Sequence, residues 1–189
     1  FVTQRENAKL ALIQPAYADG MLQISAPGHE PVRVSLDADA DGVATRRVVV
    51  WKSTCDAVDQ GDTIAAWLSD FLGQSVRLVK QADADGRLTS NSHTDQPAPV
   101  SFADGYPLLL ANSASLADLN NRLLARDKDT LLMNRFRPNV VIDGAGAWAE
   151  DEWTRLLIGG VPFDSVKPCA RCEITTIDQA TATVPDYQE

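Results

Sequence analysis

Long apolar runs are missing from this chain of 189 residues. The longest obvious one, from Tyr106 to Ala111, is far shorter than the roughly 20 residues that cross a bilayer as a helix. Hydrophobic residues still make up 44% of the chain and charged residues 23%, which is typical of globular proteins. We therefore expect a folded protein without a membrane span, built as one large domain or two small ones.

Cysteine and positive charge are also scarce. The three cysteines, Cys55, Cys169 and Cys172, form an odd and sparse set, unlike the dense, even pattern of a disulfide-stapled secreted domain. This favours a reducing, cytoplasmic compartment. Lys and Arg total 17 against 26 Asp and Glu, so the net charge of -9 makes nucleic acid an unfavourable partner. Because the chain begins at Phe1 rather than Met, we expect that its natural N-terminus and any targeting signal have been lost or removed.

Short strands are the main expectation for the first half of the chain. Alternating apolar and β-branched residues predict strands at Leu10 to Ile13, Met21 to Ser25, Pro31 to Leu36, Arg46 to Trp51 and Ser75 to Lys80. Between the last two, apolar residues at helical spacing predict a helix with Asp62 and Thr63 as N-caps and Gly73 as its end. The polar stretch from Gln81 to Pro99 predicts a loop and a possible subdomain boundary.

The second half repeats this mixture of short elements. We expect a buried strand from Tyr106 to Leu110, and a helix that Ser115 caps and whose leucines share one face. A strand from Val140 to Asp143 follows, and Gly159-Gly160 is typical of a two-residue hairpin turn. The predicted fold class is therefore α+β and mostly β, with a few short helices.

An acidic segment matches the first positions of a calcium-binding loop. Asp37, Asp39 and Asp41 alternate before Gly42, as in an EF-hand. The closing glutamate position falls on Val48, inside a predicted strand, and no helix precedes the loop. A solvated acidic turn is the better interpretation.

The Cys169-Ala170-Arg171-Cys172 element admits several interpretations. A zinc site would need two more ligands, and only Cys55, His29 and His93 are available, at irregular spacing. A thioredoxin-like redox pair should open a helix, whereas β-forming residues follow Cys172. Buried structural thiols are as plausible from spacing alone. Positive charge from Arg171 and Lys167 favours a metal-binding thiolate.

Four blocks of the chain, in order, resemble MOSC-domain proteins. They are Phe102 to Pro107 (FADGYP), Arg135 to Val141 (RFRPNVV), Ala149 to Trp153 (AEDEW), and Val166 to Cys172 (VKPCARC) with Thr175-Thr176. The resemblance is closest to the bacterial hydroxylaminopurine-detoxifying proteins and the mitochondrial amidoxime-reducing component. It covers most of the chain, although the first half matches only loosely.

The resemblance implies a MOSC β-barrel from residue 97 to 189, preceded by a small β-rich N-terminal module from residue 1 to 96. Both modules would be truncated. The family's Pro-Val-Lys-Ser segment has no counterpart before Phe1, and the strand that completes the barrel is missing after Glu189. Retention of a cofactor by this chain is therefore in question.

The resemblance also implies a molybdenum cofactor (molybdopterin) and a set of residues that hold it. The metal ligand would be Cys172, with Cys169 as a neighbour and not a ligand. The guanidinium of Arg137 could grip the pterin phosphate and Asn139 its polar edges. Asp104 would be the nearest candidate for a catalytic acid. The full cofactor-binding set would be Cys172, Arg137, Pro138, Asn139, Asp104, Gly105, Tyr106, Ala170 and Arg171.

The implied reaction is reduction of small N-hydroxylated compounds to amines, a detoxifying activity. No flavin, haem or ferredoxin pattern is present, so a flavoprotein reductase or an iron–sulfur domain would supply electrons. The alternative is a sulfur-carrier or cofactor-maturation module with a cysteine persulfide, as in MOSC domains fused to cofactor sulfurases. The other domain of those proteins resembles pyridoxal-phosphate enzymes, and this chain shows no sign of one.

Overall fold

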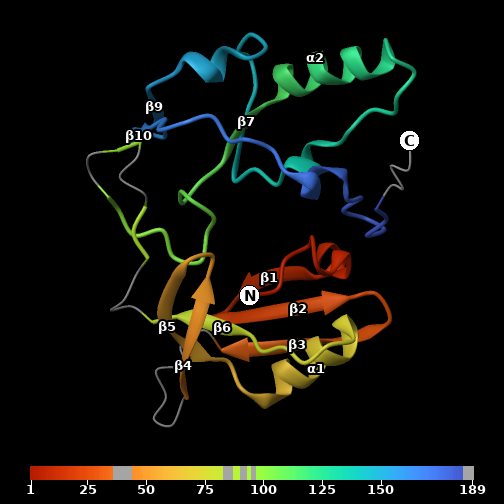
Figure 1. The fold of residues 1–189 in the computed structure, drawn as a ribbon, viewed down its shortest axis with the longest axis vertical. Coiled ribbons are helices and arrows are strands. Elements are labelled where there is room, and N and C mark those ends of the chain that lie inside the picture. Colours follow the sequence, from red (N-terminus) through yellow and green to blue (C-terminus); the bar gives the residue numbers. More distant parts are fainter. Residues whose placement is uncertain (36–43, 83–86, 90–92, 95–96, 185–189) are drawn as a thin grey trace. The chain divides into compact units, whose positions relative to one another are not determined.

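A computed structural model describes residues 1–35, 44–82, 87–89, 93–94 and 97–184 (Figure 1). The chain divides into two compact units, each described below by itself. The first unit comprises Phe1–Arg87 and Thr176–Glu189, and the second comprises Leu88–Thr175. The acidic segment from Asp37 to Gly42, considered above as a calcium loop, lies outside the described residues.

Two antiparallel sheets form most of the first unit (Figure 1). One has the order β1-β2-β3, with β1 at Gln14–Ala18, β2 at Met21–Ala26 and β3 at His29–Ser35. The other has the order β4-β5-β6, with β4 at Thr45–Val50, β5 at Ser53–Asp59 and β6 at Val79–Gln81. The strands predicted from Met21, from Pro31 and from Arg46 are confirmed within one or two residues, whereas β1 and β5 were not predicted.

The strand predicted from Leu10 to Ile13 is wrong. Ala8–Leu12 instead form a 3-10 helix, and the side chain of Asn7 accepts a hydrogen bond from Lys9 N at 3.2 Å. Asparagine at this position satisfies an unpaired helix amide locally, which outweighs the strand preference of the short apolar run.

Helix α1, Asp62–Leu72, supplies the core of the first unit. Ile64 and Leu68 are buried with Ile24 of β2, and apolar residues of β2 and β3 pack against them. Gly73 ends the helix in the left-handed conformation, as predicted (φ 70°). The predicted N-caps are wrong, because Gly61 holds that position.

A buried carboxylate fixes the start of α1. Asp59, whose side chain is 3% exposed, accepts hydrogen bonds from Arg46, from Arg77 and from Gly61 N. Arg77 also donates to Asp62, at 2.7 Å. The hydrogen bond from Arg77 above all lowers the pKa of Asp59 far below its usual value, against the opposing effect of burial.

The second unit combines two small pairs of strands with one helix (Figure 1). Strand β7, Leu110–Asn112, pairs in parallel with β8, Val140–Ile142, and helix α2, Ser113–Leu124, begins directly after β7. Strands β9, Arg155–Ile158, and β10, Val161–Asp164, form the hairpin predicted around Gly159-Gly160. Two 3-10 helices of this unit occupy Met133–Phe136 and Ala149–Glu152, and a third, Glu173–Thr176, lies at its C-terminal boundary.

The strand predicted from Tyr106 to Leu110 is displaced. Residues 101–107 lie in turns and bends, and β7 begins only at Leu110. Pro107 has no N–H to donate to a neighbouring strand, so regular pairing cannot continue through it. Asn112, not Ser115, caps α2, and its side chain accepts a hydrogen bond from Ala114 N at 3.0 Å.

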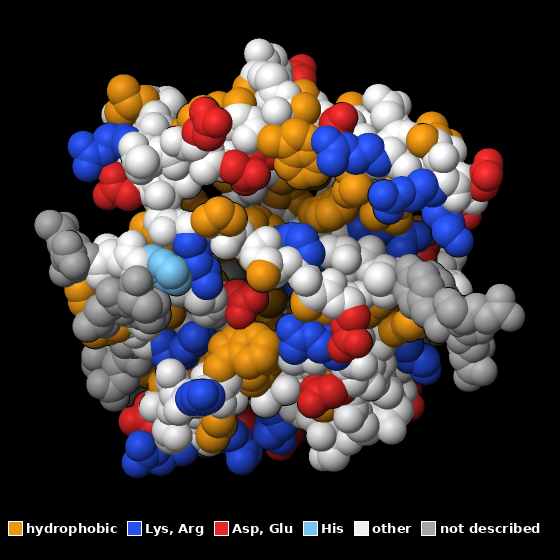
Figure 2. Space-filling view, turned by 45° about the horizontal axis from the view of Figure 1, so that its top comes forward, with side chains coloured by type: hydrophobic (Ala, Val, Ile, Leu, Met, Phe, Trp, Pro, Cys, Tyr) orange, Lys and Arg blue, Asp and Glu red, His pale blue; other side chains and the backbone are white. Residues whose placement is uncertain are grey.

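The prediction of a mostly β fold with few helices is confirmed. The described strands form four small open sheets of two or three strands, so a closed barrel is not found among them and stays a prediction. In the same part of the chain, no helix has the length and apolar character needed to cross a membrane. Acidic and basic side chains are interspersed on the face drawn in Figure 2, with hydrophobic side chains exposed between them.

Candidate functional site

The Cys-x-x-Cys element lies in irregular backbone between β10 and the last 3-10 helix. Both Cys169 and Cys172 are exposed, so the interpretation as buried structural thiols is wrong. The residues after Cys172 are also not a strand, since Glu173–Thr176 form a 3-10 helix. The carbonyl oxygen of Cys172 accepts hydrogen bonds from Thr175 N at 3.2 Å and from Thr175 Oγ1 at 3.0 Å. Local bonds thus hold its backbone while its side chain is accessible.

Arg171 connects this element to the block around Arg137. Its Nη2 donates to the carbonyl oxygen of Phe136 at 2.7 Å, and its guanidinium lies 5.7 Å from the centre of the Phe136 ring. Its Nη1 donates to the sulfur of Cys169 at 3.3 Å. These contacts place a cation beside one thiol and fix the thiol segment next to the block that begins at Arg135.

Arg137 and Asn139 have different surroundings. Arg137 is exposed and adopts the left-handed conformation (φ 52°, ψ 46°) directly after the 3-10 helix. The side-chain oxygen of Asn139 accepts a hydrogen bond from Leu109 N at 2.9 Å, and Asn139 N donates to Leu109 O at 2.8 Å. Asn139 therefore aligns the start of β8 with β7, while Arg137 presents its guanidinium to solvent. Pro138, between them, is half-buried.

Asp104, Gly105 and Tyr106 lie in the bends that precede β7. Asp104 and Gly105 are exposed and Tyr106 is half-buried. A Cβ at Gly105 would meet no heavy atom within 4 Å, so this position leaves open space. The ammonium of Lys167 lies 5.8 Å from the centre of the Tyr106 ring. This contact connects the bends with the segment that leads to Cys169.

The Ala149 to Trp153 block has a structural role, through Glu150. Glu150 accepts hydrogen bonds from Ser115 Oγ at 2.5 Å and from Asn112 Nδ2 at 2.8 Å, both at the start of α2. Burial raises the pKa of Glu150, but these hydrogen bonds outweigh it, so the pKa is lowered overall. The carboxylate therefore stays charged where α2 exposes unpaired amides, which favours an anion.

The candidate residues all belong to the second unit. The structure brings Arg171 to Phe136 and Lys167 to Tyr106, and it leaves Arg137, Lys167, Ala170 and Arg171 exposed. Sequence reasoning missed Phe136, whose carbonyl and ring hold Arg171. An aromatic residue directly before Arg137 was the available signal, since guanidinium groups stack on aromatic rings.

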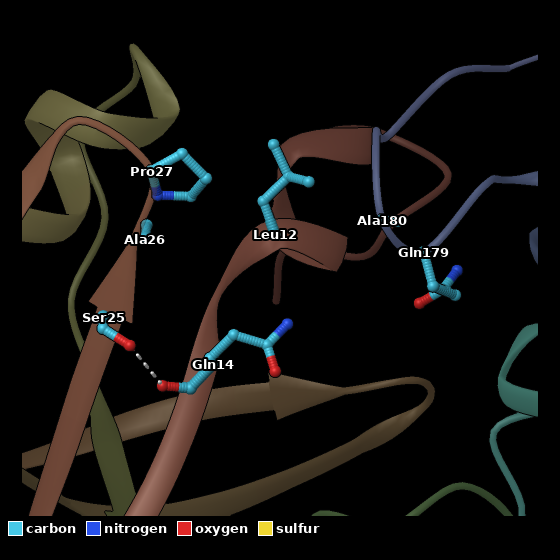
Figure 3. Close-up of a pocket in the computed structure, with 7 residues that line it drawn as sticks. All are labelled: Leu12, Gln14, Ser25, Ala26, Pro27, Gln179 and Ala180. Atoms are coloured by element: carbon cyan, nitrogen blue, oxygen red, sulfur yellow. Dashed lines mark hydrogen bonds between the residues drawn. The ribbon is translucent and has the colours of Figure 1, made fainter.

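A pocket of about 320 Å³ lies elsewhere, in the first unit (Figure 3). Its lining is Leu12, Gln14, Ser25, Ala26, Pro27, Gln179 and Ala180. These side chains include no charged group and no thiol, so they offer neither a metal ligand nor an acid or base. No group of three or more His, Cys, Asp or Glu side chains in the described part of the chain could hold a metal ion.

Comparisons with known proteins match both halves of the chain. The profile of the MOSC N-terminal beta barrel domain matches residues 1–75, and that of the MOSC domain matches residues 97–189. Human mitochondrial amidoxime reducing component 2 is 34% identical over 99% of this chain and 56% of its own length. Mouse mitochondrial amidoxime-reducing component 1 is 35% identical, over 100% and 55%. Human molybdenum cofactor sulfurase is 31% identical, over 95% and 22%. The chain thus spans between about a fifth and just over half of these relatives.

Proposed function

Since this chain belongs to the MOSC family, we propose that it binds a molybdenum cofactor through Cys172 and reduces N-hydroxylated compounds with it. The exposed thiol of Cys172 carries this proposal. A thiolate is a soft ligand that suits such a metal, and the bonds from Thr175 to the Cys172 carbonyl hold the ligand's backbone in place. The bound cofactor would supply the redox chemistry.

Three exposed cations of the second unit fit the anionic part of this cofactor. Arg137, Lys167 and Arg171 are exposed cations in the same unit as the thiol. A guanidinium can hold a phosphate group with two parallel hydrogen bonds, and Arg137 is presented for such a contact. Arg171 is already bonded to Phe136 O, so we assign it the positioning of the thiol segment. The bends at Asp104 to Tyr106 and the backbone of Pro138, Asn139 and Ala170 would complete the pocket.

The reaction proposed takes two electrons and two protons and converts a hydroxylamine into an amine, or an amidoxime into an amidine, with release of one water. The names of the amidoxime reducing components favour this substrate class. The exposed carboxyl of Asp104, which lies in one of the four blocks that resemble the family, is the candidate to transfer a proton. The electrons would come from a flavoprotein reductase or an iron–sulfur donor. A boundary between residues 96 and 97, a closed barrel and a cytoplasmic location stay predictions.

A sulfur-carrier function is the second candidate, because a molybdenum cofactor sulfurase is among the relatives and two thiols are exposed. In that case Cys169 or Cys172 would carry a persulfide and no metal would be needed. Intact mass would then show a gain of one sulfur atom.

Two matched variants test the main proposal. The chain is expressed in a host that makes the cofactor, and molybdenum per protein is measured for the wild type, Cys172→Ala and Cys169→Ala. We expect Cys172→Ala to lose the metal and Cys169→Ala to keep it, because both thiols are exposed and only Cys172 has the proposed ligand role. Equal molybdenum in all three proteins would exclude Cys172 as the ligand. A sulfur adduct without molybdenum would favour the second candidate.

A further inference from the structure

The pocket of the first unit has one wall that hydrogen bonds hold in place. Gln179 pairs with the buried Gln4 through two reciprocal amide bonds, each 3.2 Å long, and its Nε2 also donates to Ile177 O at 3.2 Å. Asp178 Oδ1 accepts a hydrogen bond from Ala180 N at 3.0 Å. Since its polar atoms already have partners, Gln179 offers the pocket mainly its methylene groups.

The other side of the pocket comes from the first 3-10 helix, β1 and the end of β2 (Figure 3). Leu12 ends the helix that Asn7 caps, and Pro27, whose ring restricts its own backbone, directly follows β2. Ser25 Oγ donates to the backbone oxygen of Gln14 at 3.4 Å. Both sides belong to the same compact unit, so the pocket is formed before a ligand arrives.

The side-chain amide of Gln14 has no hydrogen-bond partner among the described residues. Figure 3 shows it extending from β1 toward the side of the pocket where Gln179 lies. The amide offers an N–H donor and a carbonyl acceptor side by side. The pair of Gln4 with Gln179 shows, in the same unit, how a second amide satisfies both groups at once. A ligand with an amide group can pair with Gln14 in the same way.

Charge and size restrict the ligand further. The lining consists of Leu, Gln, Ser, Ala and Pro residues, and these side chains carry no charge. An ionised ligand would therefore lose hydration without gaining a counter-ion from the lining. The volume of about 320 Å³ accommodates about ten non-hydrogen atoms, if each takes the roughly 30 Å³ that one water molecule occupies in the liquid.

We propose that this pocket binds small neutral molecules that carry an amide group on an apolar body. The amide pairs with the side chain of Gln14, and the apolar body packs against Leu12, Pro27 and Ala180. Because Gln14, Pro27 and Ala180 are exposed, water competes for the site, and we expect a dissociation constant of about 1 mM. The binding needs no molybdenum cofactor, so it is independent of the proposed function.

Benzamide is a probe of this size, and the test uses the full chain without cofactor. In an NMR titration, benzamide should shift the methyl signals of Leu12, Ala26 and Ala180 and leave those of Leu157, an exposed leucine of the second unit, unchanged. Benzoate has the same shape but is ionised at neutral pH, so it should bind at least tenfold more weakly. Acetophenone accepts a hydrogen bond but donates none, so it should bind severalfold more weakly.

Two results of this titration would overturn the proposal. Equal affinity for benzamide and benzoate would show that the pocket does not select a neutral amide. Shifts at Leu157 as large as those at Leu12 would show general adsorption of the ring to exposed apolar side chains.

Two variants test the residues assigned to the pocket. Gln14→Leu should lose the preference for benzamide over acetophenone, whereas Gln74→Leu, which changes an exposed glutamine outside the pocket, should keep it. Ala180→Trp should fill the pocket and abolish the binding of both ligands. Residues 14 and 180 are exposed, so both variants should fold, which circular dichroism verifies. An unchanged preference in Gln14→Leu, or undiminished binding by Ala180→Trp, would contradict the proposal.

Discussion

The two units of this protein are held together in different ways. Among the described residues, the buried hydrophobic side chains belong to the first unit, with the single exception of Val100. The second unit instead buries polar side chains, among them Asn112 and Ser115, and it exposes large apolar ones such as Leu132 and Leu157. The unit that carries the candidate site is therefore the one with less apolar packing.

Directional bonds replace that packing in the second unit. Asn112 and Ser115 bond to Glu150, and Asn139 bonds to the backbone of Leu109. The side chain of Asn120 both donates a hydrogen bond to the backbone of Leu131 and accepts one from it. Each such bond adds only about 1 kcal/mol net, whereas removal of one partner from a buried pair costs more. The second unit should thus depend on a few specific side chains.

The largest effect is expected in the first unit, from Asp59→Ala. This change leaves Arg46 and Arg77 facing a buried site without their carboxylate, which should cost about 3 kcal/mol of unfolding free energy. Hydrogen exchange of the α1 amides measures the loss. Asp56→Ala is the matched control, because its pair with Arg47 is exposed and worth at most about 1 kcal/mol. Equal losses in the two variants would show that burial of Asp59 does not matter.

A smaller loss, restricted to the second unit, is expected for Glu150→Gln. The amide nitrogen of glutamine would face a donor from Ser115 or Asn112, so one buried bond is lost, at about 2 kcal/mol. Hydrogen exchange in α2 should accelerate while exchange in α1 stays unchanged. Glu152→Gln changes an exposed side chain of the same 3-10 helix and should affect neither. Faster hydrogen exchange in α1 would contradict the expectation that the hydrogen bonds of Glu150 and those of Asp59 stabilise their units independently.

Acid should weaken both units by the same physical route. Folding lowers the pKa of Asp59 and of Glu150, so the unfolded chain binds more protons and stability falls as the pH falls. Each contribution is complete above the ordinary carboxyl pKa of about 4 and is lost below it. Urea unfolding from pH 6 to pH 3 should show a shallower pH dependence for Asp59→Ala than for the wild type. The same slope in both proteins would assign the acid sensitivity to other groups.

Local patterns predicted those parts of the fold that local chemistry determines. The apolar spacing before Gly73 gave the length and end of α1, and Gly159-Gly160 gave the β9-β10 hairpin. The strand expected at Leu10 failed because one asparagine side chain capped a helix. The side-chain pairs at Asp59 and Glu150 join residues 13 to 38 positions apart, and spacing carries no signal for such pairs. The candidate site could be predicted only from the resemblance to a known family, which rests on four blocks in the same order.

Substitutions of Arg137 should have the smallest effect on stability, and they should separate stability from cofactor binding most clearly. A side chain in the left-handed conformation is disfavoured where glycine is not, so Arg137→Gly should be about 1 kcal/mol more stable than Arg137→Ala. Both variants lack the guanidinium, so both should retain less molybdenum cofactor, and to the same degree. Urea unfolding and metal content measure the two quantities separately. If Arg137→Gly retained as much cofactor as the wild type, Arg137 would have no role in cofactor binding. Its presence in a left-handed conformation that favours glycine would then be unexplained.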